Sequence, residues 1–143
     1  MILYLDTSGF VKLYLDEPHA DSVRRWAQNA EVLATSRVAY PEAVAALARR
    51  RREGDLDADA FQRVLRALKQ QWPDVAVLDL AEIHAGDLAI KHGLRGLDAI
   101  PLAAALDLRH ASPDARVAFS SFDVRLNQAA AAEGLPVLDA HAE

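Results

Sequence analysis

Residues 1–12 read MILYLDTSGFVK, a short apolar run that ends on an acidic residue. The run Ile2–Leu5 is typical of a strand that is buried on both faces of a parallel sheet. Asp6 follows it directly, and Thr7 and Ser8 then suit the first turn of a helix. The stretch therefore predicts a buried strand, an acidic residue at its carboxyl end, and a helix that starts at once.

Similar short runs recur along the chain, separated by longer segments with helical periodicity. Val44, Leu47 and Ala48, for example, are spaced three or four residues apart. Strands that alternate with helices favour right-handed crossovers and parallel pairing. Residues 1–143 therefore predict one α/β domain, a three-layer α/β/α architecture with a mainly parallel central sheet. The expected strands are Ile2–Leu5, Val32–Ala34, Val75–Leu78, Val117–Phe119 and Pro136–Leu138.

Glycine and proline mark where the helices are expected to begin and end. Gly54, Gly93 and Gly134 each follow a helical segment and suit the left-handed position just after a helix. Another helix is expected to open at residues 96–98, with Pro101 in its first turn, where a missing N–H costs little.

Composition excludes several classes of protein. The chain has 143 residues, and its 16 Lys and Arg against 21 Asp and Glu give a formal net charge of −5. It has no cysteine, which excludes disulfides, thiolate metal sites and a cysteine nucleophile. No apolar run reaches the ~20 residues of a membrane span, and the acidic residue at position 6 argues against a secretory signal. We therefore expect a cytoplasmic protein with no membrane partner.

Four acidic residues follow expected strands or open expected helices: Asp6, Glu42, Asp98 and Asp123. Ligands of parallel sheets bind at the carboxyl ends of the strands, so all four side chains can meet at one edge. Each also has a purely structural interpretation. The three aspartates are good helix N-caps, and a glutamate near a helix N-terminus gains about 0.3–1 kcal/mol from the helix dipole.

Taken together, the four carboxylates would repel one another unless a divalent cation neutralised them. Oxygen ligands, with no cysteine and no histidine pair four residues apart, favour Mg²⁺ or Mn²⁺ over Zn²⁺. Such a centre suits the hydrolysis of phosphodiester bonds. Ser8 and Ser121 lie next to the acids in sequence. Their hydroxyls either orient the carboxylates or serve as ordinary turn and cap residues.

Three motifs carry a resemblance to a known family. DTSGFVKLYLDE at residues 6–17 resembles the opening of PIN-domain ribonucleases of the VapC type, the toxins of bacterial toxin–antitoxin pairs. GLRGLDAI at residues 93–100 is similar to the third acidic motif of that family. SFDVRL at residues 121–126, followed by EGLPV at residues 133–137, is similar to its C-terminal motif.

This resemblance implies a metal-dependent endoribonuclease. Asp6, Glu42, Asp98 and Asp123 match the acidic quartet that binds Mg²⁺ or Mn²⁺, and Ser8 and Ser121 match its supporting hydroxyls. It also implies a homodimer, a structured RNA substrate such as tRNA or a ribosomal RNA loop, and a small cognate antitoxin that inhibits the enzyme by occupying its groove. Pro41 and Pro101 depart from the family pattern and can change how Glu42 and Asp98 are presented.

Basic charge is concentrated in one part of the chain. Residues 37–72 hold eight cations against five acids, and clustered arginines supply the phosphate contacts that a net charge conceals. The same arginines also complement a helix C-terminus, form a solvated face, or suit an acidic segment of an antitoxin. The candidates for RNA contact are Arg49, Arg50, Arg51, Arg52 and Arg95.

Two other classes of protein must be weighed against the nuclease. A phosphorylation-regulated signalling domain also gathers acids around Mg²⁺, but it needs an acidic pair after the first strand and a lysine near the last. Here Asp6 is followed by Thr7, and no lysine occurs after Lys91. The second alternative is a catalytically inert binding module with the same scaffold. The presence of all four acids argues against such a module, and RNA cleavage by the purified protein would distinguish a nuclease from it.

Overall fold

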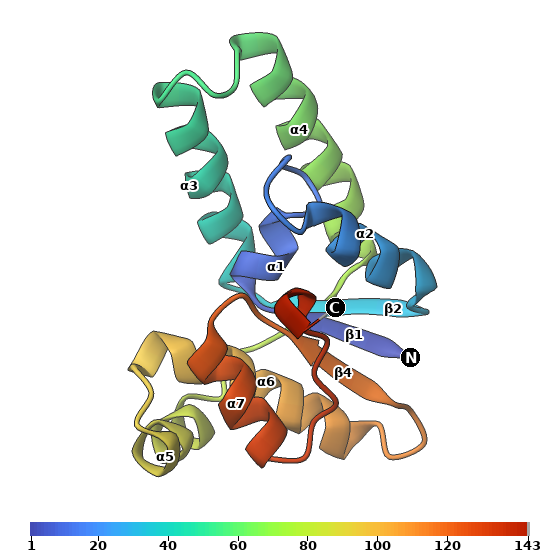
Figure 1. Ribbon diagram of the computed structural model, residues 1–143, viewed down its shortest axis with the longest axis vertical. Helices are drawn as coiled ribbons and strands as arrows, with labels where there is room; N and C mark the ends of the chain where they lie inside the picture. The colour runs from blue at the N-terminus through green and yellow to red at the C-terminus, as the bar shows by residue number, and fades with distance from the viewer. Residues whose placement is uncertain (143) are drawn as a thin grey trace.

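A four-stranded parallel sheet forms the centre of the computed structural model, which describes residues 1–142 (Figure 1). The strand order is β3-β2-β1-β4, so the strand nearest the N-terminus lies inside the sheet. All three pairs of neighbouring strands are parallel, as predicted. The strands are β1 (Ile2–Leu5), β2 (Val32–Ser36), β3 (Ala76–Leu78) and β4 (Val117–Ser120).

The predicted fifth strand at Pro136–Leu138 is wrong. Only one isolated bridge forms there, between Val137 and Phe119 of β4. The N–H of Phe119 donates to the carbonyl of Pro136, and the N–H of Leu138 donates back to Phe119. Proline has no N–H to extend this pairing. Past Leu138 the chain turns into a short 3₁₀ helix at residues 140–142, so the pairing ends after a single step.

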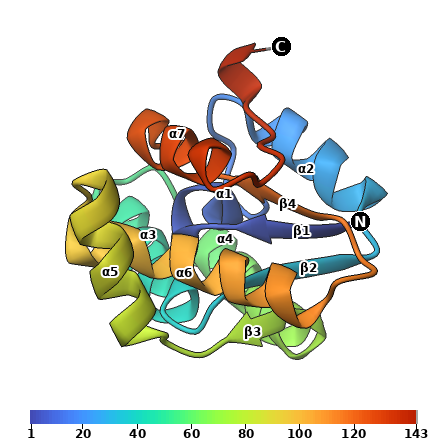
Figure 2. The ribbon, with the colours of Figure 1, turned by 90° about the horizontal axis from the view of Figure 1, so that it is seen from below.

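Helices cover both faces of the sheet, which confirms the three-layer α/β/α architecture (Figures 1 and 2). Two separate hydrophobic clusters fill the space between the sheet and its two helical layers. One layer holds α1 (Thr7–Val11), α2 (Ala20–Asn29), α3 (Ala39–Arg52) and α4 (Ala58–Gln71), and the other holds α5 (Glu82–His92), α6 (Gly96–Ala111) and α7 (Val124–Ala132).

Strand β1 contributes to both cores because its side chains alternate between the two faces. Leu3 and Leu5 pack with Phe10 on the side of α1–α4. Tyr4 points to the opposite face, where its ring stacks on Phe119 with 5.7 Å between centroids. All of these side chains are buried. The strand is therefore fixed from both sides, and its carboxyl end has a defined position.

The glycine positions match the predicted helix ends. Gly54, Gly93 and Gly134 have φ angles of 85°, 64° and 83°, in the left-handed region that favours glycine. Pro41 is the third residue of α3, where its missing N–H disturbs no helical bond. The placement of Pro101 in a first turn is wrong, because α6 already begins at Gly96.

Pro101 is the sixth residue of α6, inside the helix. Lacking an N–H, it cannot make the hydrogen bond that the carbonyl of Leu97 would otherwise accept. Both residues line the site described below. The helix therefore has a carbonyl without its usual helical bond beside this site.

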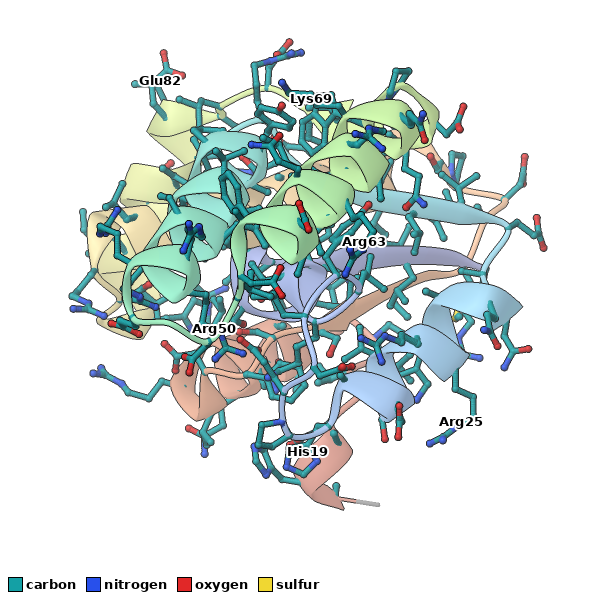
Figure 3. All side chains as sticks on the ribbon, turned by 90° about the horizontal axis from the view of Figure 1, so that it is seen from above. His19, Arg25, Arg50, Arg63, Lys69 and Glu82 are labelled. Atoms are coloured by element: carbon teal, nitrogen blue, oxygen red, sulfur yellow. The ribbon has the colours of Figure 1, made fainter. Side chains whose placement is uncertain are left out.

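Helices α3 and α4 lie side by side and cover the outer surface of the first layer (Figure 3). Leu47 of α3 and Leu68 of α4 are both buried in the core beneath them. None of the helices in residues 1–142 combines the length and the apolar content of a membrane span.

Candidate active site

A cavity of about 780 Å³ opens at the carboxyl ends of β1, β2 and β4. All four predicted acids line it, although they come from distant parts of the chain. Ser8 and Arg95 also line its wall, whereas Ser121 is buried behind Asp6 and only 2% exposed. The structure thus brings together every acid that sequence reasoning selected: Asp6, Glu42, Asp98 and Asp123.

Asp6 is the most enclosed of the four acids, with 9% of its surface exposed. One carboxylate oxygen accepts hydrogen bonds from the hydroxyl of Ser8 at 2.6 Å and the N–H of Gly9 at 3.1 Å. The other accepts from the hydroxyl of Ser121 at 2.5 Å. Burial nevertheless raises the pKa of Asp6 above its ordinary value of 3.8, and the charge of Asp123 raises it further.

Ser121 is held in place from two sides. Its backbone N–H donates to the side-chain oxygen of Asn127, and its carbonyl accepts from the amide of Asn127. Its hydroxyl, besides donating to Asp6, accepts from the N–H of Asp123 at 3.0 Å. Ser8 makes the equivalent link on the other side, because its hydroxyl accepts from the N–H of Phe122. The loop after β4 is therefore tied to Asp6 through both serines.

Glu42 extends from the first turn of α3 and is more exposed than Asp6. Burial raises the pKa of Glu42 above its ordinary value of 4.5, and the charges of Asp6 and Asp98 add to this effect. A hydrogen bond from the hydroxyl of Thr7 acts in the opposite direction. Glu42 is thus close enough to the carboxylates of Asp6 and Asp98 for their charges to raise its pKa.

Asp98 is the third residue of α6 and not its N-cap, so the capping interpretation is wrong for this residue. The helix begins earlier, and Arg95 occupies the N-cap position. Asp98 accepts a hydrogen bond from Nε of Arg95 at 3.0 Å. Its side chain is 29% exposed. Within residues 1–142 no backbone N–H donates to the carboxylate of Asp98, which is paired with Arg95 and lines the cavity.

Asp123, in contrast, does cap its helix. One of its oxygens accepts from the backbone N–H groups of Arg125 at 2.9 Å and Leu126 at 3.3 Å, at the start of α7. Asp6 likewise caps α1 through Gly9. The structural and functional interpretations therefore coexist here, because the capping bond fixes a carboxylate that also lines the cavity.

The donor set fits a hydrated divalent cation. Four carboxylates and no sulfur or imidazole line the cavity, which favours Mg²⁺ or Mn²⁺. Within residues 1–142 no three acidic or histidine side chains already stand in the close arrangement of a metal shell. Mg²⁺ usually keeps several waters and takes only one or two carboxylates directly, so such a shell is not required. Burial is the main cause of the raised pKa of Asp6 and Glu42, and a cation would relieve the repulsion between carboxylates that adds to it.

The five candidate arginines differ in their surroundings. Arg49 and Arg52 line a second groove that adjoins the cavity, whereas Arg51 does not. Arg50 is half-buried and lies within ion-pair distance of Glu17 and Asp55. Arg95 is 88% exposed and paired with Asp98. In the sequence Arg49–Arg52 form one basic run. In the structure Arg49 and Arg52 line the groove, whereas Arg50 and Arg51 do not.

Two polar contributors went unrecognised in the sequence. Thr7 hydrogen-bonds to Glu42, and Asn127 holds Ser121 through its side-chain amide. Asn127 is 7% exposed in an otherwise alanine-rich helix. A lone asparagine in such a helix is the one signal that pointed to it, because a buried amide needs hydrogen-bond partners.

Comparisons with known proteins agree with this geometry. The family model described as PIN domain matches residues 3–132. Ribonuclease VapC49 from Mycobacterium tuberculosis is 35% identical over 142 residues, covering 97% of this chain and 96% of that protein. FitAcB from Neisseria gonorrhoeae aligns with a TM-score of 0.64 and 18% identity over 97% of each chain.

A third similar protein is VapC20 from Mycobacterium tuberculosis, described as a sarcin–ricin loop cleaving toxin. It aligns with a TM-score of 0.61 and 20% identity, over 93% of this chain and 95% of that one. At this level of identity the structural matches bear on the fold alone.

Proposed function

Because this chain belongs to the PIN-domain family, among the VapC ribonucleases, we propose that it is a metal-dependent endoribonuclease and the toxin of a toxin–antitoxin pair. RNA cleavage is the activity for which its relatives at 35% identity are named. The observation that carries the proposal is the convergence of Asp6, Glu42, Asp98 and Asp123 on one cavity. We assign the catalytic and metal-binding roles to these four acids.

A bound Mg²⁺ or Mn²⁺ supplies a Lewis acid for the phosphodiester and lowers the pKa of an attacking water. The protein's part is positioning. Hydrogen bonds from Ser8, Ser121 and Gly9 hold the carboxylate of Asp6 in one orientation. The helix caps hold Asp6 and Asp123, so these carboxylates are in place before substrate arrives. Ser8 and Ser121 are thus positioning residues for the metal ligands.

Partners and assembly belong to the same proposal. A small antitoxin inhibits the enzyme by occupying the groove at the active site, as the family resemblance implies. We also propose that residues 1–143 form one nuclease domain that acts as a homodimer. Ile83, Ile90 and Leu97 support a contact between copies, since each is more than three-quarters exposed near α5 and the start of α6. Light scattering of the purified protein tests the dimer.

Cleavage of RNA by the purified full-length chain tests the proposed activity. Total bacterial RNA is incubated with protein and Mg²⁺ or Mn²⁺, and parallel samples contain EDTA. We expect discrete fragments with metal, none with EDTA, and recovery when Mn²⁺ is added in excess. Cleavage that persists in EDTA would exclude the metal mechanism. No cleavage under any condition would favour the inert binding module.

Asp98→Asn is the most informative variant for the site. Asp98 caps no helix and accepts no backbone hydrogen bond within residues 1–142, so the change removes charge with little effect on folding. We expect the rate to fall by at least about 100-fold, the upper end of what outer-shell changes at metal sites cause. Asp107→Asn on the same helix is the matched control, because Asp107 is half-exposed and paired with His84 outside the cavity. Equal rates in the two variants would refute the assignment.

A further inference from the structure

A second groove, of about 690 Å³, adjoins the active-site cavity. Thr7, Ser8, Glu42 and Phe122 line both spaces, so the groove is continuous with the site. One wall is formed by α3, and the other by α1 and the turn that follows it. Any polymer that enters the cavity from this side must pass between these two walls.

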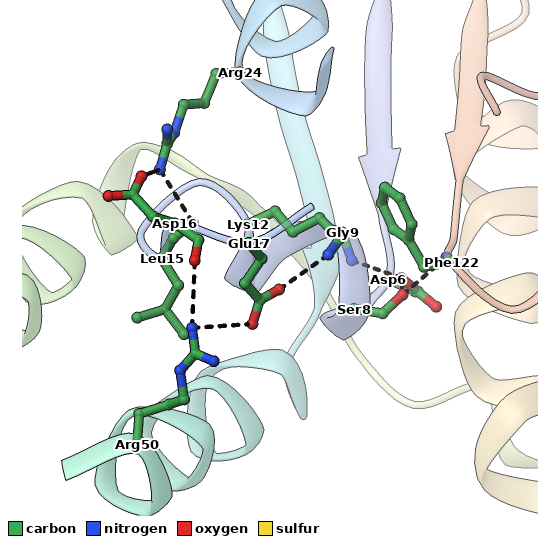
Figure 4. Close-up of polar contacts among 10 residues, drawn as sticks. All are labelled: Asp6, Ser8, Gly9, Lys12, Leu15, Asp16, Glu17, Arg24, Arg50 and Phe122. Atoms are coloured by element: carbon green, nitrogen blue, oxygen red, sulfur yellow. Dashed lines mark hydrogen bonds and ion pairs between the residues drawn. The ribbon is translucent and has the colours of Figure 1, made fainter. Parts of the chain in front are cut away.

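The basic side chains of this groove differ in their interactions with the rest of the protein. Lys12 donates to Glu17 at 3.0 Å and lies 4.4 Å above the ring of Phe122 (Figure 4). Glu17 also lies 4.0 Å from Arg50. The one acid in the groove away from the active site is therefore already shared between two cations of the protein.

Arg49 and Arg52, in contrast, are exposed and have no ion pair or hydrogen bond from their side chains within residues 1–142. Arginine without a partner presents five donors that match a phosphate group. The uncompensated charge of the groove is thus positive, and it lies beside a cavity whose charge is negative.

The helical repeat explains why these two arginines face the groove, since each lies seven residues after another groove residue of α3: Arg49 after Glu42, and Arg52 after Ala45. Arg49 lies seven residues after Glu42, almost two full turns, so the two side chains share a face and stand about 10 Å apart along the axis. Arg51 lies nine residues after Glu42 and projects from the opposite side. Ala45 and Ala46 line the groove between Glu42 and Arg49, and their small side chains leave room for a backbone.

We propose that this groove binds the RNA backbone to one side of the bond that is cut, with Arg49 and Arg52 contacting its phosphates. Arg50 and Arg51 do not take part, because Arg50 is engaged by the protein and Arg51 faces away. This assignment rests on the proposed nuclease function and names where its substrate extends. Continuity with the acidic cavity favours RNA over an acidic peptide, since a phosphodiester must reach that cavity to be cut.

The salt dependence of RNA binding tests this proposal. The Asp98→Asn background prevents cleavage, and the probe is bulk bacterial tRNA and ribosomal RNA. Loss of two phosphate contacts in Arg49→Ala/Arg52→Ala should flatten the plot of log affinity against log salt by about 1.4 for single-stranded and about 1.8 for duplex parts of the RNA. The matched control is Arg51→Ala/Arg66→Ala, which removes the same charge from exposed positions outside the groove and should keep the slope of the parent.

Further measurements separate folding from binding. Arg49→Lys/Arg52→Lys keeps both charges and should restore most of the slope, which a folding defect in the alanine variant would not explain. In the cleavage-competent background the alanine pair should raise KM much more than it lowers kcat. Thermal unfolding of all variants without RNA should give similar midpoints, since both arginines are exposed.

Three outcomes would overturn the inference. Equal slopes in the two alanine pairs would place the RNA elsewhere. Unchanged RNA binding with weaker binding of the antitoxin encoded beside this chain would assign the groove to the protein partner. If wild-type protein neither binds nor cleaves RNA, the proposed function fails and the inference with it. Wild-type cleavage with equal slopes, in contrast, would refute the groove assignment alone.

Discussion

Removing the hydroxyl of Ser121 should show how much the hydrogen bonds around Asp6 contribute to the free energy of unfolding. In Ser121→Ala the buried carboxylate of Asp6 loses a donor at 2.5 Å, and the N–H of Asp123 loses its acceptor at 3.0 Å. A hydrogen bond to a charged group contributes about 1.5–3 kcal/mol, and water cannot replace it at a residue that is 2% exposed. We expect the free energy of unfolding to fall by about 2–3 kcal/mol.

Ser8→Ala is the matched comparison. The hydroxyl of Ser8 makes the same two kinds of bond, to the carboxylate of Asp6 and from the N–H of Phe122, but Ser8 is exposed. Water can take its place, so this variant should lose only about 0.5–1.5 kcal/mol. At about 3 °C per kcal/mol for a chain of this length, Ser121→Ala should lower the melting midpoint by about 6–9 °C.

Urea unfolding at neutral pH in EDTA, followed by circular dichroism, measures both variants. Loss of the bond from Ser121 should also raise the pKa of Asp6 further, so the difference from wild type should shrink at acidic pH, where Asp6 is protonated. Equal costs for the two serine variants, or a cost below about 0.5 kcal/mol for Ser121→Ala, would refute the argument from burial.

Four further variants test other parts of the structure. Burial raises the pKa of Asp6, so the folded state holds its proton more tightly, and wild type should lose stability relative to Asp6→Asn as pH rises above about 4 in EDTA. Mg²⁺ should reverse that trend in a thermal melt. Lys91 and then His92 lower the pKa of Glu133, so Glu133→Gln should cost about 1 kcal/mol at pH 7 and less as pH falls below about 4, measured by urea unfolding. Gly93→Ala should cost about 1 kcal/mol because its φ is 64°, whereas Gly86→Ala within α5 should stabilise by about 0.5–1 kcal/mol; equal melting midpoints would contradict this.

Local sequence signals predicted all four strands of the sheet and the placement of the acids at its edge. The run before Asp6 alone predicted β1 and the position of its carboxylate. The strand prediction failed at Pro136–Leu138, where the pattern was apolar but proline restricts pairing to one bridge. The start of α6 at residues 96–98 was predicted, but its N-cap was not, because Asp98 is a better N-cap residue than Arg95 and the helix nevertheless begins before it.

Contacts between distant segments were beyond the reach of the sequence. The division of the arginine run depends on Glu17, which meets Arg50 through the turn after α1. His19, with a left-handed φ of 68° just before α2, has its ring against Phe122 and His141 from the far end of the chain. Similarly, the hydrogen bond from the hydroxyl of Ser121 to Asp6 joins residues that lie 115 positions apart in the chain. These features follow from tertiary structure and not from any local pattern.

A bound metal ion, located by crystallography, would identify the ligands of the proposed metal centre. Crystals of the full chain grown with Mn²⁺ would be measured for anomalous scattering at the manganese edge. We expect one or two peaks in the cavity, with a carboxylate oxygen of Asp6 as a ligand and others from Glu42, Asp98 or Asp123. Crystals of Asp98→Asn should show weaker occupancy at the same Mn²⁺ concentration. A peak only outside the cavity, or no peak at saturating Mn²⁺, would contradict the assignment of these acids as the metal centre of a ribonuclease.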